Sequence, residues 1–179
     1  MDSIQVIDRR FRPYLRESQI LERVRAVAAD IARDYTDRNP IFLAVLNGSF
    51  VFAADLMRCL EMPCEIAFVK MASYAGMNTT GEVKQLLGLS VDIEGRDVIV
   101  VEDIVDTGFT MEALLGLLQT KKPASVNICS LLVKPDKLQV DGLPLNYRCF
   151  DIPNDFIIGY GLDYDGQARN LRDIYVVEE

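Results

Sequence analysis

The stretch of sequence that decides the fold is Arg96-Asp97-Val98-Ile99-Val100-Val101-Glu102-Asp103-Ile104-Val105-Asp106-Thr107-Gly108-Phe109-Thr110. Its β-branched run at residues 98–101 predicts a strand that is buried on both faces of a parallel sheet. Residues 111–115 follow with a pattern that is typical of the first turns of a helix. The stretch therefore indicates a strand, a turn and a helix within an open α/β sheet.

Three carboxylates and a glycine turn stand where this strand is expected to end. Ligands of open α/β sheets bind beyond the carboxyl ends of the strands. Residues 106–110 offer main-chain N–H groups, two hydroxyls and a helix N-terminus, which together favour a phosphate. Glu102 and Asp103 suit an anion only if a divalent cation or sugar hydroxyls lie between. A phosphorylated sugar with Mg²⁺ satisfies both halves of the stretch, whereas the plainer alternative is a strand end with solvated acids and a capped helix.

The composition is that of one soluble globular domain. The chain has 179 residues, of which 50% are hydrophobic and 26% are charged, and this length is sufficient to bury a sizeable core. The net charge of −8 and the pI near 4.6 argue against nucleic acid or an anionic membrane surface as a partner. An anionic substrate therefore needs local help from a metal ion, main-chain N–H groups or a few placed cations.

Cysteine and histidine usage narrows the chemistry further. Cys59, Cys64, Cys129 and Cys149 form no C-x-x-C pair, and the chain has no histidine. Zinc sites and His-based triads are therefore excluded, and free thiols in a reducing cytosol are the simplest interpretation. The N-terminus shows no apolar signal region, and no run approaches the roughly 18 apolar residues of a spanning helix. We expect a cytoplasmic protein.

The remaining pattern alternates strands with helices, which favours a mostly parallel sheet flanked by helices. Apolar residues at helical spacing predict an amphipathic helix over residues 18–35. Further helical runs begin at residues 50 and 111, and each follows an apolar run and a glycine turn. The predicted strands lie at residues 41–46, 64–71, 85–90, 98–101, 126–133 and 174–177.

Four other segments carry candidate functional residues, each with a plainer alternative. The turn Leu46-Asn47-Gly48 precedes a helix and is an anion site in principle, although Asn-Gly is most often only a turn. Residues 72–84, which include Ser73 and Tyr74, are small and polar, and this indicates either a lid or a surface hairpin. Lys134 ends a buried strand and faces either the site or solvent. Residues 150–171 are rich in aromatics and glycine, which either line a flat ligand or fill a core.

Residues 98–110, Val-Ile-Val-Val-Glu-Asp-Ile-Val-Asp-Thr-Gly-Phe-Thr, resemble the phosphoribosyl pyrophosphate (PRPP) signature of the type I phosphoribosyltransferases. The flanking segments resemble the hypoxanthine-guanine phosphoribosyltransferases, from about Ile41 to the C-terminus. The resemblance implies the type I phosphoribosyltransferase fold, an α/β fold in which helices flank a central, mostly parallel sheet and a small hood subdomain is added. We expect one domain over residues 1–179, with a core at about 18–145 and a hood from the N-terminal and C-terminal segments.

The resemblance also implies an activity in purine salvage. A purine nitrogen displaces pyrophosphate from C1 of PRPP, which gives IMP from hypoxanthine or GMP from guanine. Asp106 would be the general base that takes the proton from purine N7. Glu102 and Asp103 would bind the ribose hydroxyls of PRPP, directly or through Mg²⁺. The predicted 5′-phosphate contacts are Asp106, Thr107, Gly108, Phe109 and Thr110.

Further roles carry over from the family residue by residue. The predicted pyrophosphate contacts are Leu46, Asn47, Gly48, Ser73, Tyr74 and Arg169. The predicted purine contacts are Lys134, Phe156, Ile157 and Asp163. Lys134 would donate to the exocyclic oxygen of a 6-oxopurine and so discriminate against adenine, because lysine is only a donor. Phe156 would stack on the purine, Ile157 would offer backbone contacts, and Asp163 would also lie near a second Mg²⁺.

Two alternatives stand beside the enzyme. A PRPP-binding regulator of the same fold would show no base-dependent turnover, and the low basic content of the chain counts against RNA binding. A phosphorylatable receiver domain also combines an acid pair with a lysine, but there the acid pair opens the chain, so we discard it. The resemblance implies PRPP and 6-oxopurine bases as partners, and a homodimer or homotetramer. The chain departs from some relatives at Asn47, Phe109 and Asn170.

Overall fold

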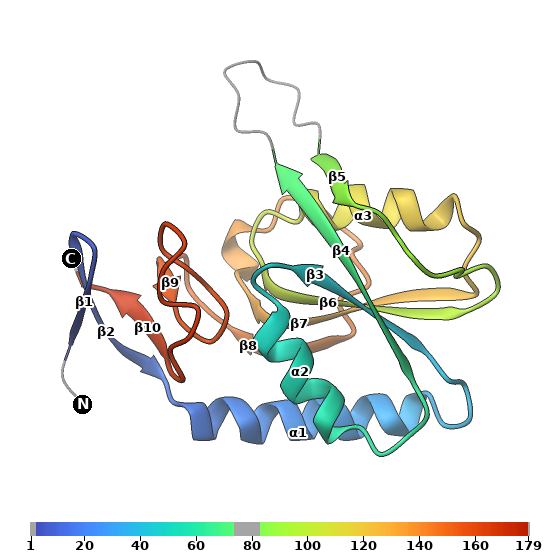
Figure 1. Cartoon of the computed structure of the whole chain (residues 1–179), viewed down its shortest axis with the longest axis horizontal. Coiled ribbons are helices and arrows are strands. Elements are labelled where there is room, and N and C mark those ends of the chain that lie inside the picture. Colours follow the sequence, from blue (N-terminus) through green and yellow to red (C-terminus); the bar gives the residue numbers. More distant parts are fainter. Residues whose placement is uncertain (1–2, 74–82, 179) are drawn as a thin grey trace.

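The computed structural model describes residues 3–73 and 83–178, and these residues form two sheets and three α-helices (Figure 1). The larger sheet has the strand order β5-β4-β3-β6-β7-β8. All its neighbouring strands are parallel except β5, which is antiparallel to β4. The strands are β3 (Ile41–Leu46), β4 (Glu65–Ser73), β5 (Val83–Leu87), β6 (Asp97–Val105), β7 (Ser125–Val133) and β8 (Tyr147–Asp151). The helices are α1 (Glu17–Asp34), α2 (Phe50–Cys59) and α3 (Phe109–Gln119), and a 3-10 turn, η1 (Pro135–Lys137), follows β7.

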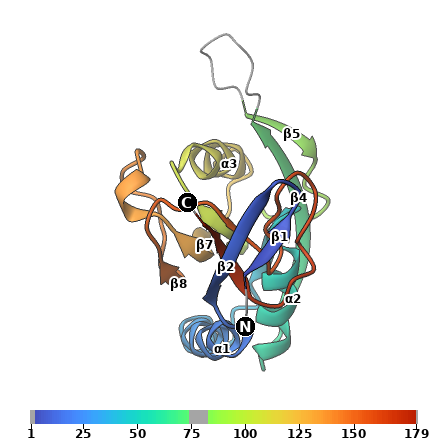
Figure 2. The ribbon, with the colours of Figure 1, turned by 90° about the vertical axis from the view of Figure 1, so that its left-hand side faces the viewer.

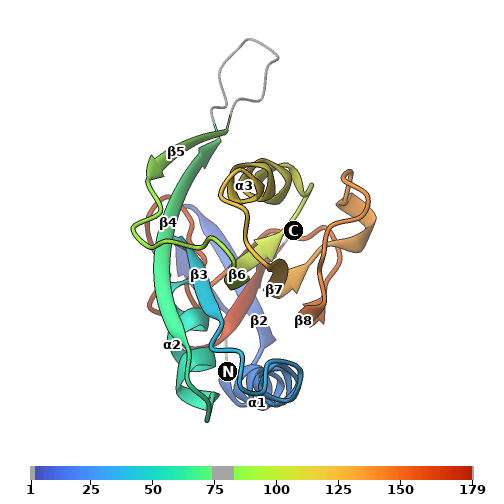
Figure 3. The same ribbon diagram turned by 90° about the vertical axis from the view of Figure 1, so that its right-hand side faces the viewer.

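Helices cover both faces of this sheet. Figure 2 and Figure 3 show α3 on one face and α1 and α2 on the other. Successive side chains of a strand point to opposite faces, and the core divides accordingly. In β3, Phe42 and Ala44 pack with α1 and α2, whereas Ile41 and Leu43 pack with α3. Because both faces are covered, the central strands are continuous apolar runs in the sequence, as predicted.

The second sheet joins the two ends of the chain. Its strand order is β1-β2-β10-β9, and Figure 1 shows it beside the larger sheet. Phe11, Ile158 and Tyr175 form its small buried core. These features confirm the predicted fold class, an α/β fold with a small hood. The strands are β1 (Ile4–Val6), β2 (Arg9–Leu15), β9 (Ile157–Ile158) and β10 (Ile174–Val177).

Several predicted boundaries differ from the structure. The sequence predicts a strand over residues 98–101, but β6 continues to Val105, so Glu102 and Asp103 lie inside it. The reason is unequal pairing: β6 pairs with β3 only as far as Val101, whereas it pairs with β7 as far as Val105. In addition, β5 covers residues 83–87 instead of 85–90, and β8, which belongs to the larger sheet, lies outside the predicted strands.

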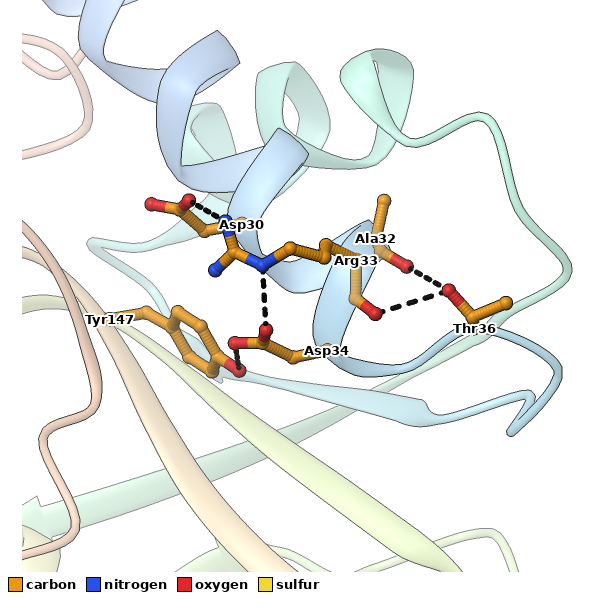
Figure 4. A network of polar contacts seen from close by, with 6 residues as sticks. All are labelled: Asp30, Ala32, Arg33, Asp34, Thr36 and Tyr147. Atoms are coloured by element: carbon orange, nitrogen blue, oxygen red, sulfur yellow. Dashed lines mark hydrogen bonds and ion pairs between the residues drawn. The ribbon is translucent and has the colours of Figure 1, made fainter.

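A polar network anchors the C-terminal end of α1 to the larger sheet (Figure 4). Tyr147, on the edge strand β8, donates a hydrogen bond of 2.8 Å to Asp34, and Arg33 binds the other oxygen of that carboxylate at 3.1 Å. Asp30 also accepts a hydrogen bond from Arg33 at 3.0 Å. Thr36 donates to the carbonyl oxygens of Ala32 and Arg33 at the end of the helix. The contacts fix α1 against the sheet on the side away from the hood.

Candidate active site

The carboxyl ends of β3 and β6 border a cavity of about 460 Å³. This is the edge at which ligands of parallel α/β sheets bind. The sequence-predicted residues that line the cavity are Leu46, Asn47, Gly48, Glu102, Asp103, Asp106, Thr107, Gly108, Thr110, Asp163 and Arg169. The cavity lining also includes hydrophobic residues that sequence reasoning did not select, among them Val45, Met71 and Met111.

The acid pair of β6 lies where this strand extends past β3. The side chain of Glu102 is buried, and its Oε1 accepts a hydrogen bond of 3.1 Å from the main-chain N–H of Asp103. An oxygen of Asp103 accepts a similar bond of 2.9 Å from the N–H of Ile104. Burial, followed by the charge of Asp103, raises the pKa of Glu102 well above the usual value. A divalent cation at this wall would favour the ionised form of Glu102, which burial and the charge of Asp103 disfavour.

The loop after β3 packs closely against this acid pair. The peptide bond between Leu46 and Asn47 is cis. A Cβ atom on Gly48 would lie 1.7 Å from Oδ2 of Asp103, so any larger residue at this position would displace the Asp103 carboxylate. On its other side, a Cβ atom on Gly161 would lie 2.2 Å from the carbonyl oxygen of Gly48. Gly48 is therefore held between the end of β6 and the C-terminal segment.

The turn between β6 and α3 has the form expected of a phosphate loop. Gly108 has φ of +93° and is the N-cap residue of α3, which begins at Phe109. The first N–H groups of a helix have no partner inside it, so they are available to an anion. The carbonyl oxygen of Thr107 accepts a hydrogen bond of 2.9 Å from the N–H of Gln139, which ties the turn to the segment after β7. Phe109 itself is exposed and does not line the cavity.

Asp106 is held by two lysines from the end of β7. Oδ2 of Asp106 lies 2.8 Å from Nζ of Lys137 and 3.8 Å from Nζ of Lys134. The Lys134 side chain is 9% exposed, and its Nζ is also 3.5 Å from an oxygen of Asn154. Oδ1 of Asp106 is buried and has no hydrogen-bond partner among the residues that the structure describes. The structure therefore brings Lys134 beside Asp106, although Lys134 does not line the cavity itself.

The far wall of the cavity comes from the C-terminal segment. Arg169 forms an ion pair of 2.8 Å with Asp163 and donates a hydrogen bond of 2.7 Å to the carbonyl oxygen of Gly161. Asp163 also accepts a bond of 2.7 Å from the N–H of Gly166. Arg169 is therefore already oriented, and it adds a positive charge to a wall that otherwise carries carboxylates.

The predicted purine platform lies in the hood. Phe156 is 40% exposed, and its ring meets those of Phe11 and Tyr164 at centroid distances of 6.2 and 5.6 Å. The guanidinium of Arg9 lies 5.8 Å from the centroid of the Phe156 ring. Ile157 is buried in β9. Neither predicted purine contact lines the cavity.

The metal prediction can be tested against the donor chemistry. Among the described residues, no group of three or more histidine, cysteine or acidic side chains is arranged to hold a metal ion. Mg²⁺ commonly binds through one or two carboxylates together with substrate phosphates, so it needs no complete protein cage. Glu102, Asp103 and Asp163 supply hard oxygen donors on the walls of one cavity. This donor set fits Mg²⁺ shared with an anionic substrate.

Three residues remain to be placed: Ser73 and Tyr74, which the sequence predicts as pyrophosphate contacts, and Lys137, which it does not predict. Ser73 is the last residue of β4, whereas Tyr74 lies outside the described residues. Sequence reasoning missed Lys137. The signal was the spacing Lys134-Pro135-Asp136-Lys137, because side chains three residues apart in a 3-10 turn lie one above the other. That turn brings the second lysine to Asp106.

Comparison with known proteins places the chain in a family. Residues 13–165 match the phosphoribosyl transferase domain. A hypoxanthine-guanine phosphoribosyltransferase of Streptococcus pyogenes is 38% identical over 164 residues, which cover 91% of this chain and 91% of that protein. A hypoxanthine-guanine-xanthine phosphoribosyltransferase of Tritrichomonas foetus is 37% identical over 179 residues, which cover 100% of this chain and 98% of that protein.

A solved structure agrees with both relatives. The crystal structure of a hypoxanthine-guanine phosphoribosyltransferase from Bacillus anthracis matches with a TM-score of 0.89 and 41% identity, and the match covers 93% of this chain and 98% of that chain. The sequence and structure comparisons therefore agree with the family that the signature of residues 98–110 indicates. The chain belongs to the phosphoribosyltransferase family, and its similarity to the hypoxanthine-guanine members extends over nearly its whole length.

Proposed function

We propose that the protein transfers the phosphoribosyl group of PRPP to hypoxanthine or guanine, which gives IMP or GMP and releases pyrophosphate. One observation carries this proposal. A single cavity joins the acid pair of β6, the turn before α3 and Arg169, and these groups match the hydroxyl, phosphate and pyrophosphate parts of PRPP. The relatives that cover the chain are named as enzymes of this reaction class, so a regulator without turnover is not favoured.

In the proposed mechanism the protein positions PRPP and stabilises developing charge. Main-chain N–H groups of residues 107–110 hold the 5′-phosphate, and Glu102 and Asp103 hold the ribose hydroxyls. Arg169 and the turn Leu46-Asn47-Gly48 face the pyrophosphate, for which Ser73 and Tyr74 stay predicted contacts. Breaking the bond at C1 builds positive charge on the ribose, so fixed carboxylates nearby favour the transition state.

On the purine side, Asp106 accepts the proton of N7 as the new bond forms at the ring. Lys134 donates to the exocyclic oxygen of a 6-oxopurine, and Phe156 stacks on the ring. Ile157 and Asp163 complete the base contacts. The position of Lys134 beside Asp106, at the carboxyl end of β7, supports this assignment.

We include Mg²⁺ as the cofactor of the proposed reaction. Glu102 and Asp103 would hold one ion and Asp163 a second, in each case together with substrate oxygens. When bound, Mg²⁺ would neutralise charge on the leaving pyrophosphate.

The proposed function is tested by nucleotide formation from PRPP and Mg²⁺ with hypoxanthine, guanine, xanthine and adenine side by side. We expect turnover of 6-oxopurines and none of adenine, because Lys134 cannot accept a hydrogen bond from an amino group. Absence of turnover with every base, while PRPP still binds, would instead support the regulator.

Asp106→Asn tests the general base. The amide keeps the size of the side chain but cannot take the N7 proton, so we expect kcat to fall by at least about a hundredfold. The affinity for PRPP, measured by calorimetry, should change little. A variant with the kcat of the wild type would remove Asp106 from the role.

We also propose a cytoplasmic location and a homodimer or homotetramer. The four cysteines are free thiols, and burial raises the pKa of Cys149 to about 12, which keeps its thiol protonated at neutral pH. No described helix is long and apolar enough to cross a membrane. Analytical ultracentrifugation would measure the oligomeric state.

A further inference from the structure

Lys137 stands at the carboxylate of Asp106 because of the 3-10 turn η1. Pro135 opens this turn, and the N–H of Lys137 donates to the carbonyl oxygen of Lys134 at 3.1 Å. The turn is anchored to the phosphate loop at two points. The N–H of Lys134 donates to the carbonyl oxygen of Val105 at 3.0 Å, and the N–H of Gln139 donates to that of Thr107 at 2.9 Å. These bonds fix the backbone of the turn, from which both ammonium groups reach Asp106.

The two oxygens of the Asp106 carboxylate are not equivalent. Oδ2 receives Lys137 at 2.8 Å, a hydrogen-bond distance, whereas Lys134 stays at 3.8 Å. Oδ1 has no partner among the residues that the structure describes. Lys137 thus engages one oxygen of the carboxylate and leaves the lone pairs of the other free.

The distances of Lys134 and Lys137 from Asp106 also indicate different roles for the two lysines. The charged groups of the adjoining cavity are the carboxylates of Glu102, Asp103 and Asp163 and the guanidinium of Arg169, which is paired with Asp163. Asp106 would therefore rely on Lys134 as its counter-ion if Lys137 were absent. An ammonium drawn fully onto Asp106 would have fewer donors for the exocyclic oxygen of a purine.

We propose that Lys137 is a positioning residue for the transfer reaction. It fixes the carboxylate of Asp106 through Oδ2 and leaves Lys134 available to the purine. This inference rests on the proposed function, in which Asp106 is the general base and Lys134 reads the 6-oxo group.

The experiment compares Lys137→Met, Lys137→Arg and, as a matched control, Lys121→Met. Lys121 is an exposed lysine that follows α3, at the opposite edge of the sheet. We expect Lys137→Met to lower kcat/KM for hypoxanthine at least about tenfold, because both the base and the reader of the purine are misplaced. The KM for PRPP should stay within about twofold of the wild-type value, since the PRPP contacts are intact. Lys137→Arg keeps the charge and the donor and should restore most of the loss, and Lys121→Met should behave as the wild type.

Each other outcome contradicts the inference. Unchanged kinetics of Lys137→Met would show that Asp106 needs no second lysine. A higher kcat would show that Lys137 competes with purine N7 for Oδ2. A parallel loss of PRPP binding without rescue by arginine would show a purely structural role. Failure of the proposed function is distinct from all of these, because the wild-type protein would then form no nucleotide with any base.

Discussion

At the residue scale, Glu102 combines a cost in stability with a proposed role in binding. Its carboxyl group is buried beside Asp103, and burial raises the pKa of Glu102 well above the usual value. When a carboxyl group has a higher pKa in the folded than in the unfolded state, the folded protein loses stability as pH rises. The loss occurs between the usual carboxyl range and the pKa of the folded state. Above that window the ionised group opposes folding. Such a residue is expected where ligand binding, and not folding, selects the side chain.

Replacement of Glu102 by glutamine therefore should stabilise the ligand-free protein while it weakens substrate binding. The amide oxygen can still accept the N–H of Asp103, and no buried charge remains. We expect the free energy of unfolding to rise by on the order of 1 kcal/mol at pH 8, with a smaller gain at pH 5. Urea titrations at both pH values measure it.

Glu22→Gln is the matched control, because Glu22 is an exposed residue of α1 and surface substitutions rarely change stability by more than about 0.5 kcal/mol. A Glu102→Gln protein that is less stable than the wild type at pH 8 would show that the ionised carboxylate is well satisfied in the apo protein.

At the element scale, the site depends on the approach of the turn after β3 to the end of β6. The loop after β3 meets the end of β6 where Gly48 lies against the carboxylate of Asp103. No local pattern specifies this contact, since the two residues come from different strand–turn–helix units. The parallel pairing of β3 with β6 brings them together.

Gly48→Ala tests this contact. The added methyl group overlaps the carboxylate of Asp103, so that side chain must leave its place on the cavity wall. We expect kcat/KM for PRPP to fall at least about tenfold, with some loss of stability. In an Asp103→Ala background the methyl group has room, so the same substitution should then have little further effect on the melting temperature.

Gly116→Ala provides the comparison, because nothing lies within 4 Å of a Cβ atom on Gly116 in α3. It should leave activity unchanged and stabilise the helix slightly. If Gly48→Ala bound PRPP as tightly as Gly116→Ala, the close packing of the loop would have no bearing on the substrate.

At the scale of the whole molecule, electrostatics oppose the binding of an anion. The net charge of −8 and the carboxylates of the cavity both repel PRPP. In the proposed function, main-chain N–H groups and Arg169 would offset part of that repulsion. A divalent cation between the acids and the substrate would remove most of the remainder, so metal and substrate are expected to bind together.

Thermal unfolding measures this coupling. A ligand at 100 times its dissociation constant stabilises a protein by about 2.7 kcal/mol, which for a chain of this size raises the melting temperature by roughly 5–10 °C. We expect that shift with PRPP and Mg²⁺ together. PRPP with EDTA at the same concentration should give a much smaller shift. Equal shifts would show that the acids of the cavity do not act through a cation.

Much of the architecture follows from local patterns. Residues 18–35 and 41–46 match α1 and β3, because burial on one helix face or on both strand faces leaves a periodic trace in the sequence. The acids and the glycine turn at residues 102–108 likewise predicted the turn that precedes α3 and lines the cavity, and the family resemblance is confirmed by the comparisons.

Sequence by itself thus determined the three helices, the approximate positions of six of the ten described strands, and the family. Only the tertiary structure decided that β6 extends beyond its pairing with β3 and that β2 pairs with β10, from the other end of the chain. It also decided that Gly48 contacts Asp103 and that Lys137 reaches Asp106. The physical reason is the distance along the chain over which each kind of interaction acts. Periodicity and turn chemistry act within a few residues of the chain, whereas these contacts depend on strand pairing between distant segments, which local patterns do not encode.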